Sequence, residues 1–236
     1  MTIAFVHGNF VTRRCWEAFV PFFESRGYKC VPIAYPLRDE TVESLRAKHP
    51  DPALARLKLS EVLDHHERII RALPEKPIII GHSFGGLLTQ LLVQRDLAAA
   101  AVTIDSVPPA NVIGTQWSFL RSVLPAINPL KRNEPYLMPF SHFQYTFVNG
   151  MPPAAQREAY DRHVVPESRV LAAGGLSSLA RVDFARPHAP LLVIAGPGWE
   201  EVAEYALTWA ERIIGKPAAR VPDRARETPD ATEARR

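Results

Sequence analysis

The segment IIIGHSFGG, residues 78–86, restricts the fold more than any other stretch of the chain. Three consecutive isoleucines predict a buried strand, and GGLLTQLLVQRD at 85–96 predicts a helix. A buried strand that passes into a helix within a few residues is typical of α/β proteins, in which helices cover a sheet. Ser83, between two glycines, therefore stands at a strand-to-helix turn.

The rest of the chain repeats this alternation of strand-like and helical patterns. The strand-like runs are apolar throughout, without a polar face, as expected for parallel strands buried on both sides. The sequence therefore predicts a mostly parallel α/β sheet covered by helices on both faces, in one domain over residues 1–215. We expect strands at 2–8, 29–36, 76–83, 99–109 and 189–196, and helices at 16–28, 60–73 and 85–96.

Two segments depart from the alternation. Residues 110–186 lack strand-like character and are rich in proline and aromatic residues, which predicts an inserted helical cap or lid over the carboxyl ends of the strands. A helical decoration with a small core of its own is an equal alternative. Residues 216–236, KPAARVPDRARETPDATEARR, predict a disordered tail by composition.

Net charge and cysteine spacing argue against a nucleic-acid-binding protein and against a cysteine metal site. The formal net charge is +3, and residues 216–236 carry +2 of it, which leaves a nearly neutral body without the basic surface that nucleic-acid binding requires. Cys15 and Cys30 lack metal-site spacing and predict buried free thiols, with one disulfide as the alternative. The chain starts directly in a strand-like run and holds no long apolar stretch, so we expect a cytoplasmic protein with no membrane contact.

GHSFG, residues 81–85, has the pattern GxSxG, and its position explains why chemistry would need it. A serine on a sharp strand-to-helix turn requires neighbours without Cβ, and the following helix N-terminus favours a developing oxyanion. The sequence therefore predicts Ser83 as a nucleophile; a helix-capping serine is the alternative. FVHGNF at 5–10 ends the first strand, and we expect the amides of Asn9 and Phe84 to form an oxyanion hole. His7 is expected to brace this loop.

With GHSFG after a buried strand and HGN after the first, the chain resembles the α/β-hydrolase family over about residues 1–215. The resemblance implies a Ser83 nucleophile, a cap at 110–186 and hydrolysis of small or medium apolar esters or related acyl compounds, without cofactor or metal. Epoxide hydrolases and haloalkane dehalogenases have a similar HGN opening, but their nucleophile is aspartate. Ser83 favours the esterase, lipase or cofactor-free haloperoxidase-like members.

The resemblance also implies an acid after the fifth strand and a histidine after one further strand. Here APLLVIAG at 189–196 is followed at once by PGWEEVAEYALTWAERIIG, which predicts the last helix. The acid turn, a strand and the histidine loop are absent, and no histidine follows His188. Asp105, after the fourth strand, is the candidate acid, with a turn-capping role as the alternative; the catalytic histidine stays unknown. His82 is expected to point away from the site. His49 is assigned to a loop, and His65 and His66 to a half-exposed helix face. His142 and His163 are assigned to the surface or packing of the cap, with a swing toward Ser83 as the alternative.

Two hypotheses follow. The chain is a serine hydrolase acting through Ser83, or a non-catalytic relative or internally deleted product that keeps the serine but lacks the histidine. Loss of the next strand would also expose the edge of the fifth strand, which predicts either weak solubility or a homodimer through that edge. A small acyl or ester compound is the expected partner in the first case.

Overall fold

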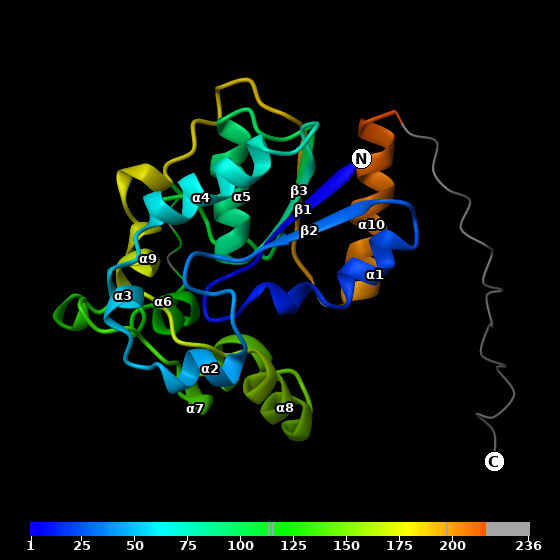
Figure 1. Cartoon of the computed structure of the whole chain (residues 1–236). Helices are drawn as coiled ribbons and strands as arrows, with labels where there is room; N and C mark the ends of the chain where they lie inside the picture. Colours follow the sequence, from blue (N-terminus) through cyan, green and yellow to red (C-terminus); the bar gives the residue numbers. More distant parts are fainter. Residues whose placement is uncertain (113, 115, 197, 216–236) are drawn as a thin grey trace, which may run out of the picture.

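The computed structural model describes residues 1–112, 114, 116–196 and 198–215, and its centre is a parallel sheet (Figure 1). The strands are β1 (Thr2–Val6), β2 (Lys29–Ile33), β3 (Ile78–His82), β4 (Ala100–Ile104) and β5 (Leu191–Ile194). They are ordered β2-β1-β3-β4-β5, and every neighbouring pair is parallel. The predicted parallel α/β sheet is confirmed, with strands somewhat shorter than their apolar runs.

The strands are apolar on both faces because both faces are covered. Ala4 and Val6 face one core with α4 (Leu59–Arg71) and α5 (Phe84–Gln94), whereas Ile3 and Phe5 face a second core with α1 (Phe19–Glu24) and α10 (Trp199–Ile213). Figure 1 shows the two pairs of helices on opposite sides of the strands. Successive residues of a strand point to opposite faces, so both positions must be apolar.

The first predicted helix, over 16–28, is divided in the structure. A 3-10 helix, η1 (Arg13–Trp16), is followed by the short α1, in which Pro21 occupies the first turn. Proline is tolerated there because the amide of a first-turn residue has no helical acceptor, whereas a helix starting at residue 16 would hold Pro21 in its interior. Gly27 follows α1 with φ +80°, as expected for a helix stop.

Residues between β4 and β5 fold into short helices with a small core of their own. This inserted segment lies beyond the carboxyl ends of the strands, beside α2 (Val42–Ala47) and α3 (Pro52–Arg56) (Figure 1). Met138, Phe143 and Val164 are buried in its core together with Phe10 of the sheet domain. Whether the segment 110–186 acts as a lid stays a prediction. Its helices are α6 (Trp117–Val123), η2 (Pro129–Lys131), α7 (Phe140–Phe143), the π-helix η3 (Gln144–Val148), α8 (Pro153–His163), α9 (Arg169–Gly174) and η4 (Ser178–Ala180).

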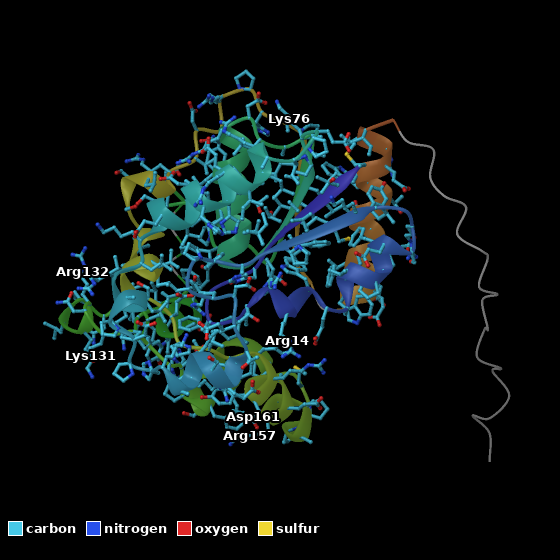
Figure 2. All side chains as sticks on the ribbon, in the orientation of Figure 1. Arg14, Lys76, Lys131, Arg132, Arg157 and Asp161 are labelled. Atoms are coloured by element: carbon cyan, nitrogen blue, oxygen red, sulfur yellow. The ribbon has the colours of Figure 1, made fainter. Side chains whose placement is uncertain are left out.

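The sheet ends at β5, whose only pairing among the described strands is with β4. Val193 is 66% exposed, and α10 begins at Trp199, five residues after β5. No helix among the described residues has the length and apolar content needed to cross a membrane. Labelled charged residues such as Lys76, Lys131 and Arg157 lie at the periphery (Figure 2). The predicted disordered tail, 216–236, lies outside the described residues.

Candidate active site

Ser83 stands at the junction of β3 and α5 in a strained backbone conformation. Its φ is 56° and its ψ is −121°, a region that costs a non-glycine residue on the order of 1–3 kcal/mol. The surrounding backbone holds it there: the Ser83 amide donates to the Ile104 carbonyl at 3.0 Å, and its carbonyl accepts from Gly86 at 2.9 Å and Val107 at 3.1 Å. The turn is therefore fixed by both β4 and α5.

The two glycines of GHSFG are required by packing. A Cβ on Gly85 would overlap the carbonyl oxygens of Val6 and His7, and a Cβ on Gly81 would overlap the carbonyl of Gly85. These contacts are with backbone, which cannot move aside as a flexible side chain can. The sharp turn at Ser83 thus depends on the close approach of α5 to the end of β1.

The loop after β1 lies directly against Ser83. A Cβ on Gly8 would be 3.1 Å from the Ser83 Cβ and 3.5 Å from its Oγ. Among the described residues, neither the Asn9 amide nor the Phe84 amide has a protein acceptor. Two unpaired amides beside a serine hydroxyl are what an oxyanion hole requires. The assignment of Asn9 and Phe84 to that role remains a prediction.

His7 braces this loop through both ring nitrogens. Its Nδ1 donates to the Gly8 carbonyl at 2.8 Å, and its Nε2 accepts from the Tyr35 amide at 3.2 Å. The Tyr35 hydroxyl donates to the His7 carbonyl at 2.6 Å. Burial lowers the pKa of His7 to about 3, so the ring is neutral at pH 7 and suits one donated and one accepted hydrogen bond. The bracing role inferred from the sequence fits these contacts.

Ser83 opens onto a cavity of about 900 Å³ between the sheet and the inserted segment. No lysine or arginine occurs among the described residues that line it, and Asp105 is its only carboxylate. Apolar side chains of the inserted segment form most of the far wall, including Phe119, Leu120, Val123, Met138 and Phe147. A second cavity, of about 430 Å³ between α4 and α9, contains neither Ser83 nor a histidine. The larger one is therefore the candidate substrate site.

Asp105 and His82 border the same cavity as Ser83. Asp105 follows β4 with φ 45°, is exposed, and its Oδ1 accepts from the Gly196 amide at 3.3 Å. Burial lowers the pKa of His82, opposed by the Asp105 charge. His82 is among the residues that line the cavity, and its predicted orientation away from the site stays a prediction. The bond to Gly196 links Asp105 to the segment after β5 and not to its own turn, so the acid role and the turn-capping alternative both stay predictions.

No histidine among the described residues forms a hydrogen bond with Ser83. His66 is buried and donates to Val62, His142 lies between Tyr136 and the Ser122 carbonyl, and His188 bonds to Ala189. His163 lies 4.0 Å from Glu17, beside α1. The described residues also contain no group of three His, Cys, Asp or Glu side chains suited to a metal ion. In the part of the chain that the structure describes, the site therefore combines a serine, two amides without a protein acceptor and one carboxylate, with no histidine hydrogen-bonded to the serine.

The order of the elements, the GHSFG turn and the HGNF loop identify the fold, and a family model agrees. The alpha/beta hydrolase family model matches residues 3–232. The chain belongs to the alpha/beta hydrolase family.

Relatives and solved structures of this hydrolase are distant. A curated relative, norfluorocurarine synthase 1 of a Strychnos species, is 32% identical over 124 residues, which is 48% of this chain and 41% of the relative. The matched part therefore spans less than half of that protein's length. Tomato methylketone synthase I complexed with 2-tridecanone superposes with a TM-score of 0.62 at 16% identity, covering 90% of this chain and 98% of the other.

A pyrethroid hydrolase from Sphingobium faniae JZ-2 superposes with a TM-score of 0.60 at 18% identity over 89% of this hydrolase and 97% of that chain. An extracellular alpha/beta-hydrolase from a Paenibacillus species has a TM-score of 0.59 at 18% identity, covering 93% and 100%. At these identities the likeness is one of fold. The superpositions cover 97% or more of each of these solved structures, although among the described residues of this chain the sheet stops at β5.

Proposed function

We propose that this chain is a serine hydrolase that attacks small or medium apolar esters, or related acyl compounds, with Ser83. The observation that carries the proposal is the strained turn that holds Ser83 at the head of α5, facing a cavity of about 900 Å³. The Asn9 and Phe84 amides would donate hydrogen bonds to the oxyanion of the tetrahedral intermediate. Family membership supports hydrolysis in general terms.

The composition of the cavity supports an uncharged substrate. With no cation among its described lining residues and one carboxylate at its edge, the site offers no counter-ion to a carboxylate or phosphate. Its apolar far wall would contact an acyl or alcohol group of several carbons. The pyrethroid hydrolase and the methylketone synthase complexed with 2-tridecanone are fold relatives whose named compounds agree with such a site.

Covalent labelling tests the nucleophile. A fluorophosphonate probe transfers its phosphonyl group to an activated serine Oγ with loss of fluoride, so wild-type protein is expected to be labelled and Ser83→Ala is not. Ser106→Ala is the matched control, because Ser106 lines the same cavity and is hydrogen-bonded to Gln90 at 3.0 Å. Labelling of folded Ser83→Ala, or none of folded wild type, would refute the proposal.

The lack of a positioned histidine favours a second candidate function. Without its base, a serine triad loses about 10⁶ in kcat and keeps about 10³–10⁴ over water from the oxyanion hole and binding. A chain in this state would bind an apolar ester in the cavity and turn it over only at this residual rate. The genomic sequence across Ala195 and Trp199 separates the two: a skipped in-frame segment encoding an acid and a histidine supports an enzyme, and continuous coding sequence supports the binding protein.

A further inference from the structure

A buried ion pair joins the inserted segment to the loop that follows β2. Arg38 Nη2 lies 2.5 Å from Glu167 Oε2, and the two side chains are 0% and 1% exposed. Burying two charges costs several kcal/mol per ion unless other hydrogen bonds compensate for the lost hydration. In the described part of the chain, Arg38 Nε and Nη1 have no hydrogen-bond acceptor. Stability alone is therefore a poor explanation for this pair.

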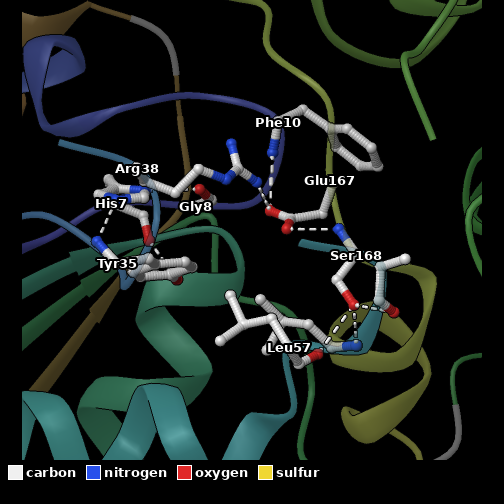
Figure 3. Close-up of polar contacts among 10 residues, drawn as sticks. His7, Gly8, Phe10, Tyr35, Arg38, Leu57, Glu167 and Ser168 are labelled. Atoms are coloured by element: carbon white, nitrogen blue, oxygen red, sulfur yellow. Dashed lines mark hydrogen bonds and ion pairs between the residues drawn. The ribbon is translucent and has the colours of Figure 1, made fainter. Parts of the chain in front are cut away.

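The Glu167 carboxylate has a second set of contacts, with backbone amides (Figure 3). Its Oε2 accepts from the Phe10 amide at 3.3 Å, and its Oε1 accepts from the Ser168 amide at 2.7 Å. Phe10 belongs to the HGNF loop and follows Asn9, the predicted oxyanion donor. The ion pair thus reaches the loop that borders Ser83.

Phe10 is held from both sides by residues at the end of the inserted segment. Its amide donates to Glu167, and its carbonyl accepts from the Val165 amide at 2.8 Å. Its φ is 66°, a left-handed conformation that a non-glycine residue adopts only under such restraint. Releasing one contact would let Phe10 relax and would rotate the peptide that precedes it. That rotation would move the Asn9 side of the site.

The main chain of Glu167 ties its side chain to the rest of the insertion. The Tyr136 amide donates to the Glu167 carbonyl at 2.7 Å, and the Glu167 amide donates to the Tyr136 carbonyl at 2.9 Å. A shift of the insertion against the sheet would therefore carry the carboxylate away from Phe10.

We propose that Glu167, neutralised by Arg38, is a positioning residue that couples docking of the inserted segment to the geometry of the oxyanion loop. It does not touch the substrate; it acts through the Phe10 amide on the direction of the Asn9 amide. The inference rests on the proposed function, since the loop matters for catalysis only if Ser83 reacts.

The test compares Glu167→Gln with Ser168→Ala. The glutamine keeps the size of the side chain but removes the charge and one acceptor oxygen. Ser168 is the matched control because it is also fully buried and joins the insertion to the sheet domain, its Oγ donating to the Leu57 carbonyl at 2.8 Å, without a bond to Phe10. Loss of either side chain's contacts lowers stability, so thermal unfolding does not distinguish the proposal from a structural role.

Two further measurements do distinguish them. Fluorophosphonate labelling of Glu167→Gln is expected to have a maximal rate roughly tenfold to a hundredfold below wild type at unchanged probe affinity, whereas Ser168→Ala keeps the wild-type rate. Hydrogen exchange of the Phe10 amide, measured by NMR, is expected to accelerate about tenfold or more in Glu167→Gln and to stay unchanged in Ser168→Ala.

Equal labelling rates in wild type and Glu167→Gln, or unchanged exchange at Phe10, would overturn the inference. If wild-type protein is not labelled, the proposed function fails instead, and exchange at Phe10 alone decides whether Glu167 holds the loop. A variant that does not fold is replaced by Glu167→Asp, which keeps the charge, shortens the reach and should likewise accelerate exchange at Phe10.

Discussion

The two sides of the Ser83 cavity differ in how well their residues are buried and hydrogen-bonded. On the β1 side every strand residue is buried, His7 and Tyr35 brace the loop, and Glu167 holds Phe10. On the β5 side the strand is half-exposed, Asp105 is exposed, and the chain passes directly into α10. The difference teaches that the sheet can hold Ser83 and the HGNF loop firmly in place while the side expected to supply the base has no strand beyond β5 among the described residues.

Among the changes on the β1 side, Gly85→Ala should lower the unfolding free energy strongly. Its Cβ would overlap two carbonyl oxygens at the end of β1, so we expect a loss of roughly 3 kcal/mol or more of unfolding free energy. Gly150→Ala is the control, because nothing lies within 4 Å of a Cβ there. Urea unfolding followed by circular dichroism measures both variants. Equal midpoints would show that the turn is not tightly packed.

Arg38→Met tests the ion pair on the same side. It leaves Glu167 charged and buried without its partner, for which we expect a loss of about 3–5 kcal/mol. Lys48→Met removes an exposed pair with Glu40 and should cost about 0–1 kcal/mol. Thermal and urea unfolding of the two variants should therefore differ clearly. A mild effect of Arg38→Met would mean that water reaches the carboxylate.

Acid should lower the free energy of unfolding, because His7 and His66 are buried in the neutral form. Burial lowers the pKa of His7 to about 3 and of His66 to about 4, from 6.5 in the unfolded chain. The unfolded state therefore binds more protons below pH 6.5. The stabilisation is complete above that pH and is lost as the pH falls toward the folded-state values, by about 1.4 kcal/mol per pH unit for each histidine.

Urea unfolding at pH 7, 6 and 5 measures this loss. His66→Gln removes one of the two groups and should reduce the steepness of the decline, while its stability at pH 7 falls because the bond to Val62 is lost. A wild-type curve that is flat from pH 7 to 5 would show that these rings are accessible to water.

The exposed β5 edge gives the smallest expected effect on stability. We propose that it pairs with the same strand of a second copy, since β5 contacts β4 alone among the described strands and Val193 is 66% exposed. Val193→Lys should shift the protein toward monomer in analytical sedimentation while unfolding free energy changes by within about 0.5 kcal/mol. A wild-type protein that sediments as a monomer at all concentrations would contradict the pairing.

Much of the fold was predictable because local patterns and packing agree. The isoleucine run of β3 can only be buried, and GHSFG permits the close approach of α5 that the structure shows at Gly85. The assignment of the Asn9 and Phe84 amides to an oxyanion hole comes from the same motifs and stays a prediction. The division of the first predicted helix between Trp16 and Phe19 carries a sequence signal in hindsight, since Pro21 suits the first turn of a helix that starts at Phe19.

The roles of Arg38 and Glu167 could not be predicted from the sequence. They are 129 positions apart, and a charged residue in a polar loop gives no sign that it will be fully buried. The sequence also did not predict that His82 would line the cavity. Neighbouring residues of a strand are expected to point in opposite directions, but the turn at Ser83 interrupts that alternation.

By itself the sequence determined the parallel sheet, the turn at Ser83 and the early passage from the fifth strand into the last helix, because each follows from residues that are neighbours along the chain. Only the tertiary structure decided which groups meet at the cavity: the insertion's Glu167 on the loop after β1, and no histidine hydrogen-bonded to Ser83 in the described residues. Such contacts depend on how distant segments pack, which local spacing does not encode.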